Sequence, residues 1–160
     1  MPSLARACGR EGESEMSAEE NKALIRRITE EVFSQGKTDA IDRYYAPNWV
    51  LHDAPPNAAP DRDALKQVLS VIRGGFPDVR ARIDLIVAEG DLVAYHTVSE
   101  GTHTKEYFGV APTGKRVTLR QLNIDRIRDG KIVESWSESF GQGFHYQLTG
   151  KAPPVAAATR

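Results

Sequence analysis

The sequence predicts an α+β domain in which helices pack on one face of a curved antiparallel β-sheet and a cone-shaped pocket lies between them. Apolar residues recur at helical spacing in the first part of the chain, and the period changes to two from Val79 onward. Further along, Asp129-Gly130 separates two stretches rich in β-branched and aromatic residues, which is a strong hairpin signal. Helices followed by a run of antiparallel strands are typical of an α+β fold.

Length and composition fit one soluble globular domain. The chain has 160 residues, of which 40% are hydrophobic and 27% charged, and this length allows a sizeable core. A net charge of −1 does not indicate nucleic acid or an anionic membrane as a partner. We find no signal peptide and no apolar run of transmembrane length, so we expect a cytoplasmic protein without membrane contact. The single cysteine, Cys8, excludes an intrachain disulfide and a cysteine-based zinc site.

The two ends of the chain differ in composition from its middle. Residues 1–16 are charged and contain glycine without periodicity, so we expect a disordered leader. Residues 151–160 are small and rich in proline and alanine, which predicts a flexible tail. The folded domain is therefore expected over residues 17–150.

Three helices are predicted before the sheet. Ser17 and Glu20 form a capping box that begins an amphipathic helix ending at Gly36. A second, short helix is expected over Asp39–Tyr44. Asp61 then caps a third helix with one apolar stripe, which Gly74-Gly75 ends.

The strands are expected at 49–53, 80–88, 92–104, 116–128 and 131–140, with a short helical turn at 144–148. Alternation places Gln121, Asn123 and Asp125 on one face of the fourth strand. In the fifth strand it predicts a common face for Ile132, Glu134, Trp136 and Glu138. Polar groups on both faces favour a sheet that lines a cavity on one side and meets water or a partner on the other.

Several short motifs occur in a characteristic order over the folded part. They are Asn21-Lys22-Ala23-Leu24, Gln35 to Asp42, Val50-Leu51-His52-Asp53, Gly75-Phe76-Pro77-Asp78, Gly101-Thr102-His103-Thr104, Pro112-Thr113-Gly114-Lys115, and Asp129 to Glu134 with Trp136. Over Glu20 to about Gly150 the chain resembles the SnoaL-like polyketide and ester cyclases of the nuclear transport factor 2-like superfamily. The resemblance implies a cystatin-like or ketosteroid isomerase-like cone, with three N-terminal helices packed on the concave face of the sheet, and a homodimer through the outer face. This fold also hosts isomerases, dehydratases, epoxide hydrolases and silent binding modules.

The resemblance also implies an acid/base aspartate on the strand before the Asp-Gly turn, and Asn123 stands at that position here. An amide can donate a hydrogen bond to a carbonyl but cannot accept a proton at neutral pH. We therefore expect Asn123 to hold a developing oxyanion while His103 or His52 moves the proton. Glu138 is a further acid/base candidate, if burial against an aromatic ring raises its pKa.

The same residue types also fit structural roles. Either histidine could instead be structural, and His52 could cap the following turn. Asn123 could be a buried amide satisfied by the backbone, and Glu138 a solvated residue at a strand end. The expected substrate-binding residues, for which core packing is the alternative, are Trp136, Tyr95, Gln121, Tyr45 and Phe76.

Other chemistries have little support in the sequence. Metal-ligand spacing is not found among the histidines, and neither a phosphate-binding loop nor a nucleophile elbow occurs. The expected function is therefore cofactor-free, metal-free cyclisation, isomerisation or dehydration of a small apolar carbonyl compound. The alternative is a catalytically silent ligand-binding or accessory module. Epoxide hydrolysis is less favoured because Arg120 and Arg126 are predicted opposite Asn123 and Asp125.

Overall fold

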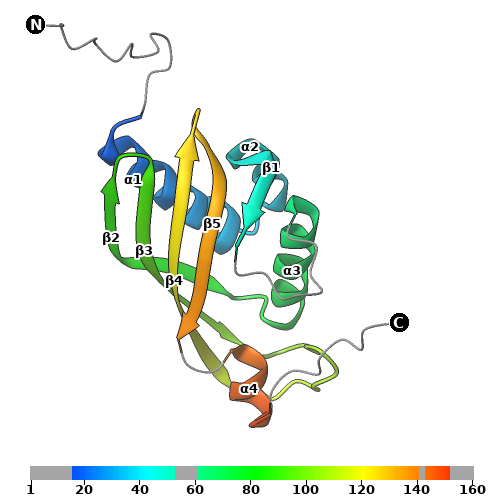
Figure 1. Ribbon diagram of the computed structural model, residues 1–160. Helices are drawn as coiled ribbons and strands as arrows, with labels where there is room; N and C mark the ends of the chain where they lie inside the picture. Colours follow the sequence, from blue (N-terminus) through cyan, green and yellow to red (C-terminus); the bar gives the residue numbers. More distant parts are fainter. Residues whose placement is uncertain (1–15, 53–60, 141–142, 152–160) are drawn as a thin grey trace, which may run out of the picture.

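The computed structural model describes residues 16–52, 61–140 and 143–151. The expected leader with Cys8 and the expected tail lie outside these ranges, apart from Met16 and Lys151. None of the helices in the described ranges is long and apolar enough to cross a membrane. The elements, in order, are α1 (Ala18–Ile28), the π-helix η1 (Thr29–Ser34), the 3₁₀-helix η2 (Thr38–Ala40), α2 (Ile41–Tyr44), β1 (Tyr45–Leu51), α3 (Arg62–Gly75), β2 (Arg80–Glu89), β3 (Leu92–Thr102), β4 (Arg116–Arg128), β5 (Lys131–Phe140) and α4 (Phe144–Thr149) (Figure 1).

The strands form one sheet in the order β1-β5-β4-β3-β2. In Figure 1, α1 crosses behind the sheet and α3 stands beside β1, so the predicted α+β class with helices on one face of a curved sheet is confirmed. We call the face packed on α1 the inner face and the opposite one the outer face. One detail differs from the expectation. Strand β1 pairs parallel with β5, while the other three pairings are antiparallel. The chain reaches this edge from a helix and not through a hairpin, so an antiparallel direction is not imposed.

The β4–β5 hairpin has the predicted bounds and one feature that the alternation did not reveal. Its turn residues Asp129 and Gly130 have φ angles of 51° and 70°, as a type I′ turn requires. Arg126 pairs with Glu134, but Ile127 pairs with Ile132, so Val133 is an extra residue in a β-bulge. The bulge moves Ile132 to the inner face, where it is fully buried. The prediction that Ile132 shares a face with Glu134, Trp136 and Glu138 is therefore wrong.

The two predicted helix caps are both present. Ser17 and Glu20 form the capping box of α1, in which the Ser17 Oγ accepts the Glu20 N–H at 3.2 Å. At α3, the Asp61 Oδ1 accepts the Ala64 N–H at 2.7 Å.

Removing the α3 cap should lower stability measurably. We expect Asp61→Ala to reduce the free energy of unfolding by about 1 kcal/mol, because an amide at the helix N-terminus loses its acceptor. Asp61→Asn keeps a side-chain oxygen at this position and should retain most of the stability. Urea denaturation of the three proteins checks this, and equal losses for both variants would contradict the capping role.

Apolar side chains form two clusters on the inner side. The main cluster joins α1 to β1 and the sheet, through Leu24, Ile25, Ile28, Tyr45, Trp49, Val93, Tyr95, Ile127 and Ile132 among others. The distal cluster contains Phe76, Val79, Tyr107, Val117, Phe144 and Leu148. Gly101 leaves room for it, since an added Cβ would lie 3.1 Å from the Phe76 Cβ. The strand segments between the two clusters carry polar side chains.

Candidate active site

A polar strip runs along β4 on the inner face. The register places Asp125 between Val93 and Ser135, and Asn123 between Tyr95 and Ser137. Asp125 is buried, with 2% of its surface exposed, whereas Asn123 and Gln121 are half-buried. The polar strip therefore leads from the main cluster toward more accessible positions. Its members are Asp125, Asn123 and Gln121 on β4, Thr97 on β3, and Ser135 and Ser137 on β5.

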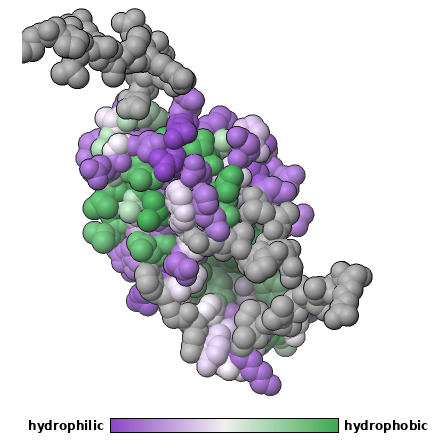
Figure 2. Space-filling model, in the orientation of Figure 1, coloured by the Kyte–Doolittle hydropathy of each residue, from purple (hydrophilic) through white to green (hydrophobic). Residues whose placement is uncertain are grey.

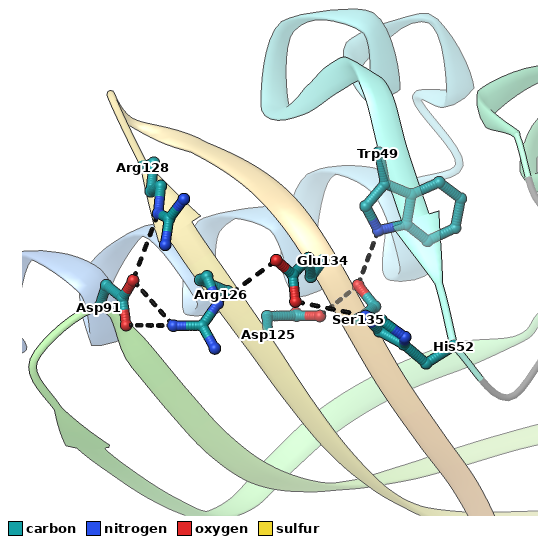
Figure 3. A network of polar contacts seen from close by, with 8 residues as sticks. All are labelled: Trp49, His52, Asp91, Asp125, Arg126, Arg128, Glu134 and Ser135. Atoms are coloured by element: carbon teal, nitrogen blue, oxygen red, sulfur yellow. Dashed lines mark hydrogen bonds and ion pairs between the residues drawn. The ribbon is translucent and has the colours of Figure 1, made fainter.

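The Asp125 carboxyl group is held by two hydroxyl groups from the neighbouring strands. Its Oδ2 accepts a hydrogen bond from the Tyr95 hydroxyl at 2.6 Å, and its Oδ1 accepts one from Ser135 Oγ at 2.5 Å. Ser135 Oγ in turn accepts from the indole Nε1 of Trp49 at 2.8 Å (Figure 3). Residues of β1, β3, β4 and β5 thus meet at one buried carboxyl group.

Burial raises the pKa of Asp125 to about 6, although the hydrogen bonds from Ser135 and Tyr95 favour its ionised form and oppose this rise. The pKa values of two neighbouring phenols are also raised. Burial and the Asp125 charge raise the pKa values of Tyr95 and Tyr45 well above 10, so both phenols are protonated at neutral pH. A carboxyl group that titrates close to neutrality can both accept and release a proton under physiological conditions.

Asn123 is oriented by two further hydroxyl groups. Its Nδ2 donates to Thr97 Oγ1 at 3.2 Å, and its Oδ1 accepts from Ser137 Oγ at 2.8 Å. An amide carries two N–H groups, and within the described ranges only Thr97 accepts one of them. The other can donate to a ligand oxygen.

His52 and Trp136 lie on the outer face, away from Asn123. Their rings stack with centroids 4.4 Å apart, and His52 Nε2 lies 3.2 Å from Glu134 Oε2. Arg126 is 3.6 Å from Glu134 and 2.9 Å from Asp91, so an ion-pair network covers this part of the outer face (Figure 3).

Glu138 and His103 are also separate from Asn123. Glu138 pairs with Leu122 and is exposed on the outer face, because it has the same parity as Trp136. His103 is fully buried beside the distal cluster, where its Nδ1 accepts the Thr113 N–H at 3.2 Å and its ring centroid lies 5.2 Å from that of Phe76. It follows Thr97 by six residues, which is roughly 20 Å along an extended strand. The structure therefore does not bring His52, His103 and Glu138 together at Asn123.

The predicted substrate-binding residues separate into three groups. Tyr95, Tyr45 and Gln121 lie on the inner side near Asp125 or Asn123, Phe76 lies with His103, and Trp136 faces outward. The residue that sequence reasoning did not assign to catalysis is Asp125. Alternation along the strand places Asp125 on the same face as Asn123, but the sequence does not indicate that Asp125 is buried. Within the described ranges, no three His, Cys, Asp or Glu side chains are placed to hold a metal ion together.

An apolar patch is exposed on the outer face. Leu85 and Val87 on β2 are 63% and 58% exposed, and Leu122 on β4 is 39% exposed. Figure 2 shows apolar side chains gathered on this side of the molecule, over β2 and β3. We call Leu85, Val87 and Leu122 the outer apolar patch. Patches of this kind are typical of surfaces that bind another protein.

Comparisons with known proteins agree on one family. Residues 23–147 match the family described as SnoaL-like polyketide cyclase. The chain is 29% identical over 110 residues to nogalonic acid methyl ester cyclase of Streptomyces nogalater, an alignment that spans 62% of this chain and 76% of the relative.

Two solved structures are similar in fold and sequence. IdmH from Streptomyces antibioticus, proposed as a polyketide cyclase, is 37% identical with a TM-score of 0.66, over 74% of this chain and 91% of that protein. AclR from Streptomyces galilaeus, proposed as a hydroxylase, is 27% identical with a TM-score of 0.73, over 88% of this chain and 87% of that one.

Proposed function

Because the chain belongs to the SnoaL-like polyketide cyclase family, we propose that it catalyses cofactor-free proton transfer on an apolar, polyketide-type carbonyl compound. The proton transfer would be coupled to cyclisation, isomerisation or dehydration. The observation that carries this proposal is the buried Asp125 carboxyl group in the polar strip, with a pKa of about 6. Asp125 takes the acid/base role that the sequence suggested for His103, His52 or Glu138.

The polar strip supplies the groups that such a reaction needs. At neutral pH the ionised Asp125 removes a proton from the carbon next to a carbonyl group, and the resulting enolate oxygen accepts a hydrogen bond from the Asn123 amide. In a cyclisation, the enolate carbon forms a bond with a second carbonyl carbon of the same molecule. Protonated Asp125 then returns its proton to the new alkoxide, so no oxidant or cofactor is consumed.

The positions of the two groups suit this division of labour. Asp125 and Asn123 are two residues apart on one strand face, which corresponds to about 7 Å. A carbonyl carbon and its neighbour can therefore lie between them. Tyr95, protonated at neutral pH, keeps the carboxyl group oriented through Oδ2.

Turnover by the unmodified protein tests the proposal. We would incubate it in D₂O with nogalonic acid methyl ester, the compound for which the Streptomyces nogalater relative is named. Deuterium uptake next to the carbonyl, or ring closure, is expected by NMR and should persist with EDTA present. No uptake with any member of a panel of β-dicarbonyl esters would contradict the proposal.

The alternative function is a ligand-binding module without catalysis. The observation that favours it is that both Asp125 oxygens already accept hydrogen bonds from Tyr95 and Ser135. Hydrogen bonds that occupy both carboxyl oxygens can stabilise the fold without any catalytic role. Calorimetric binding of the same esters without deuterium uptake would support this alternative.

We also infer that the chain forms a homodimer through the outer apolar patch, because its three large apolar side chains stand exposed on the same sheet face, with Leu85 and Leu122 on either side of His96. Sedimentation equilibrium of the wild type is then expected to give twice the chain mass of 17.7 kDa. Leu122→Glu should return the mass to that of a monomer, since a charge would be buried without a partner. Val68→Glu is the matched control, because Val68 is 54% exposed on α3 and outside the patch. A monomeric wild type, or a dimer unaffected by Leu122→Glu, would contradict the inference.

A further inference from the structure

Three side chains on three strands form a directed chain of hydrogen bonds that ends at Asp125. Trp49 on β1 contacts Ser135 on β5 at 2.8 Å, and Ser135 contacts Asp125 on β4 at 2.5 Å (Figure 3). All three residues are buried. Trp49 is far from β4 in the sequence, and it reaches this position only because β1 pairs with β5.

The chemistry of the three groups determines which atom donates in each bond. An indole N–H is a donor only, whereas a serine hydroxyl has one hydrogen and two lone pairs. Because Trp49 occupies one lone pair of Ser135, the Ser135 hydrogen cannot point toward Trp49, and among the described residues Asp125 Oδ1 is the acceptor within its reach. Ser135 is thereby held as a donor, and a donor stabilises the ionised form of a carboxyl group.

The second hydroxyl group on Asp125 is not held in the same way. Within the described ranges, the Tyr95 hydroxyl bonds only to Asp125 Oδ2. It can therefore turn to accept a hydrogen bond when Asp125 becomes protonated, whereas the Trp49 N–H excludes the Ser135 hydrogen from one of the directions into which it could turn. This asymmetry favours Oδ2 over Oδ1 as the oxygen that carries the exchangeable proton of Asp125.

We propose that Trp49 and Ser135 are positioning residues that hold Oδ1 of Asp125 unprotonated and so set the pH at which this carboxyl group exchanges its proton. The catalytic consequence of this inference rests on the proposed function, but the hydrogen-bond direction does not. The other titratable groups facing Asp125 are the phenols of Tyr95 on β3 and Tyr45 on β1. From α1, the residues in the main cluster are apolar, namely Leu24, Ile25 and Ile28.

The test follows the titration of Asp125 directly by NMR of the full chain labelled with ¹³C at aspartate carboxyl groups. Ser135→Ala removes a hydrogen bond to the ionised form, so the Asp125 midpoint should rise by about one pH unit. Trp49→Phe keeps an aromatic ring but frees the Ser135 hydroxyl to rotate, and should raise the midpoint in the same direction by a smaller amount. Ser135→Thr keeps a hydroxyl group and should restore a value near that of the wild type.

Ile132→Val is the matched control, because Ile132 lies in the main cluster with Trp49 and has no polar side-chain atom. It should leave the midpoint unchanged, which separates hydrogen bonding from packing. An unchanged midpoint in both Trp49→Phe and Ser135→Ala would overturn the inference. So would an equal shift in Ile132→Val.

The result is distinguishable from failure of the proposed function. A midpoint that rises in Ser135→Ala and Trp49→Phe supports the hydrogen-bond chain even if the protein turns over no ester. Conversely, activity that depends on Asp125 together with an unmoved midpoint keeps the proposed function and rejects the roles of Trp49 and Ser135. If the proposed function and the hydrogen-bond chain are both correct, the acid limb of the pH–rate profile should move with the NMR midpoint.

Discussion

Replacing Asp125 by asparagine is expected to lower kcat/KM for a carbonyl substrate by about 10²–10⁴-fold, the range typical for loss of one acid/base group. Asparagine has a similar shape and can still bond to Tyr95 and Ser135, so the fold should remain intact. It cannot accept a proton, however, and enolate formation then lacks its base. Steady-state kinetics on the ester, with circular dichroism as the check on folding, measures this effect.

Glu138→Gln provides the matched control for this prediction. It also converts one carboxyl group of the hairpin to an amide, but on the outer face, and its kcat/KM should stay close to that of the wild type. In the wild type, the rate should increase with pH and level off above about pH 6, where Asp125 is ionised. Near-normal turnover by Asp125→Asn, or a large loss in Glu138→Gln, would exclude Asp125 as the proton carrier.

The same carboxyl group should make folding stability fall as the pH rises. The pKa of Asp125 is about 6 in the folded protein, compared with 3.8 for an unperturbed aspartate, so the folded state binds its proton more tightly than the unfolded state. Its contribution to stability is complete below pH 3.8 and is lost as the pH rises through 6. The difference corresponds to about 3 kcal/mol.

Comparison with Asp125→Asn isolates this contribution. Other carboxyl groups act in the opposite sense, since hydrogen bonds from Thr102 and His96 lower the pKa values of Asp78 and Asp84 respectively. Both proteins share these groups, so they cancel when the free energies of unfolding are subtracted. Denaturation at pH 4 and pH 7.5 should show the variant gaining about 2 kcal/mol relative to the wild type at the higher pH. A difference that is the same at both pH values would contradict the burial of an ionising Asp125.

Features set by local interactions were predictable from the sequence. The hairpin turn at Asp129-Gly130 and the caps at Ser17 and Asp61 depend on neighbouring residues, and the structure has each of them. The direction of β1 and the bulge at Val133 depend on pairing between distant segments, which alternation within one strand does not encode.

The candidate site shows the same distinction. The alternation of side chains along β4 correctly predicted that Asn123 and Asp125 share a face. It did not predict which side chains of β5 lie beside them. The register places Ser135 and Ser137 there and turns Trp136 away. The raised pKa of Asp125 comes from burial by residues of several elements, so it could be found only once these elements were assembled.

The extra residue Val133 has a further consequence for how such proteins can diversify. It divides β5 into two segments of opposite phase, one that turns Ile132 into the core and one that presents serine hydroxyl groups to Asp125 and Asn123. If Val133 were paired regularly with Arg126 instead of bulged, Ile132 would stay inside, and Glu134, Trp136 and Glu138 would also turn inward. The interior beside Asn123 would then exchange hydroxyl groups for an indole and carboxylates without any substitution. A one-residue shift of register at this bulge is thus a route by which one fold can acquire a different reactive interior.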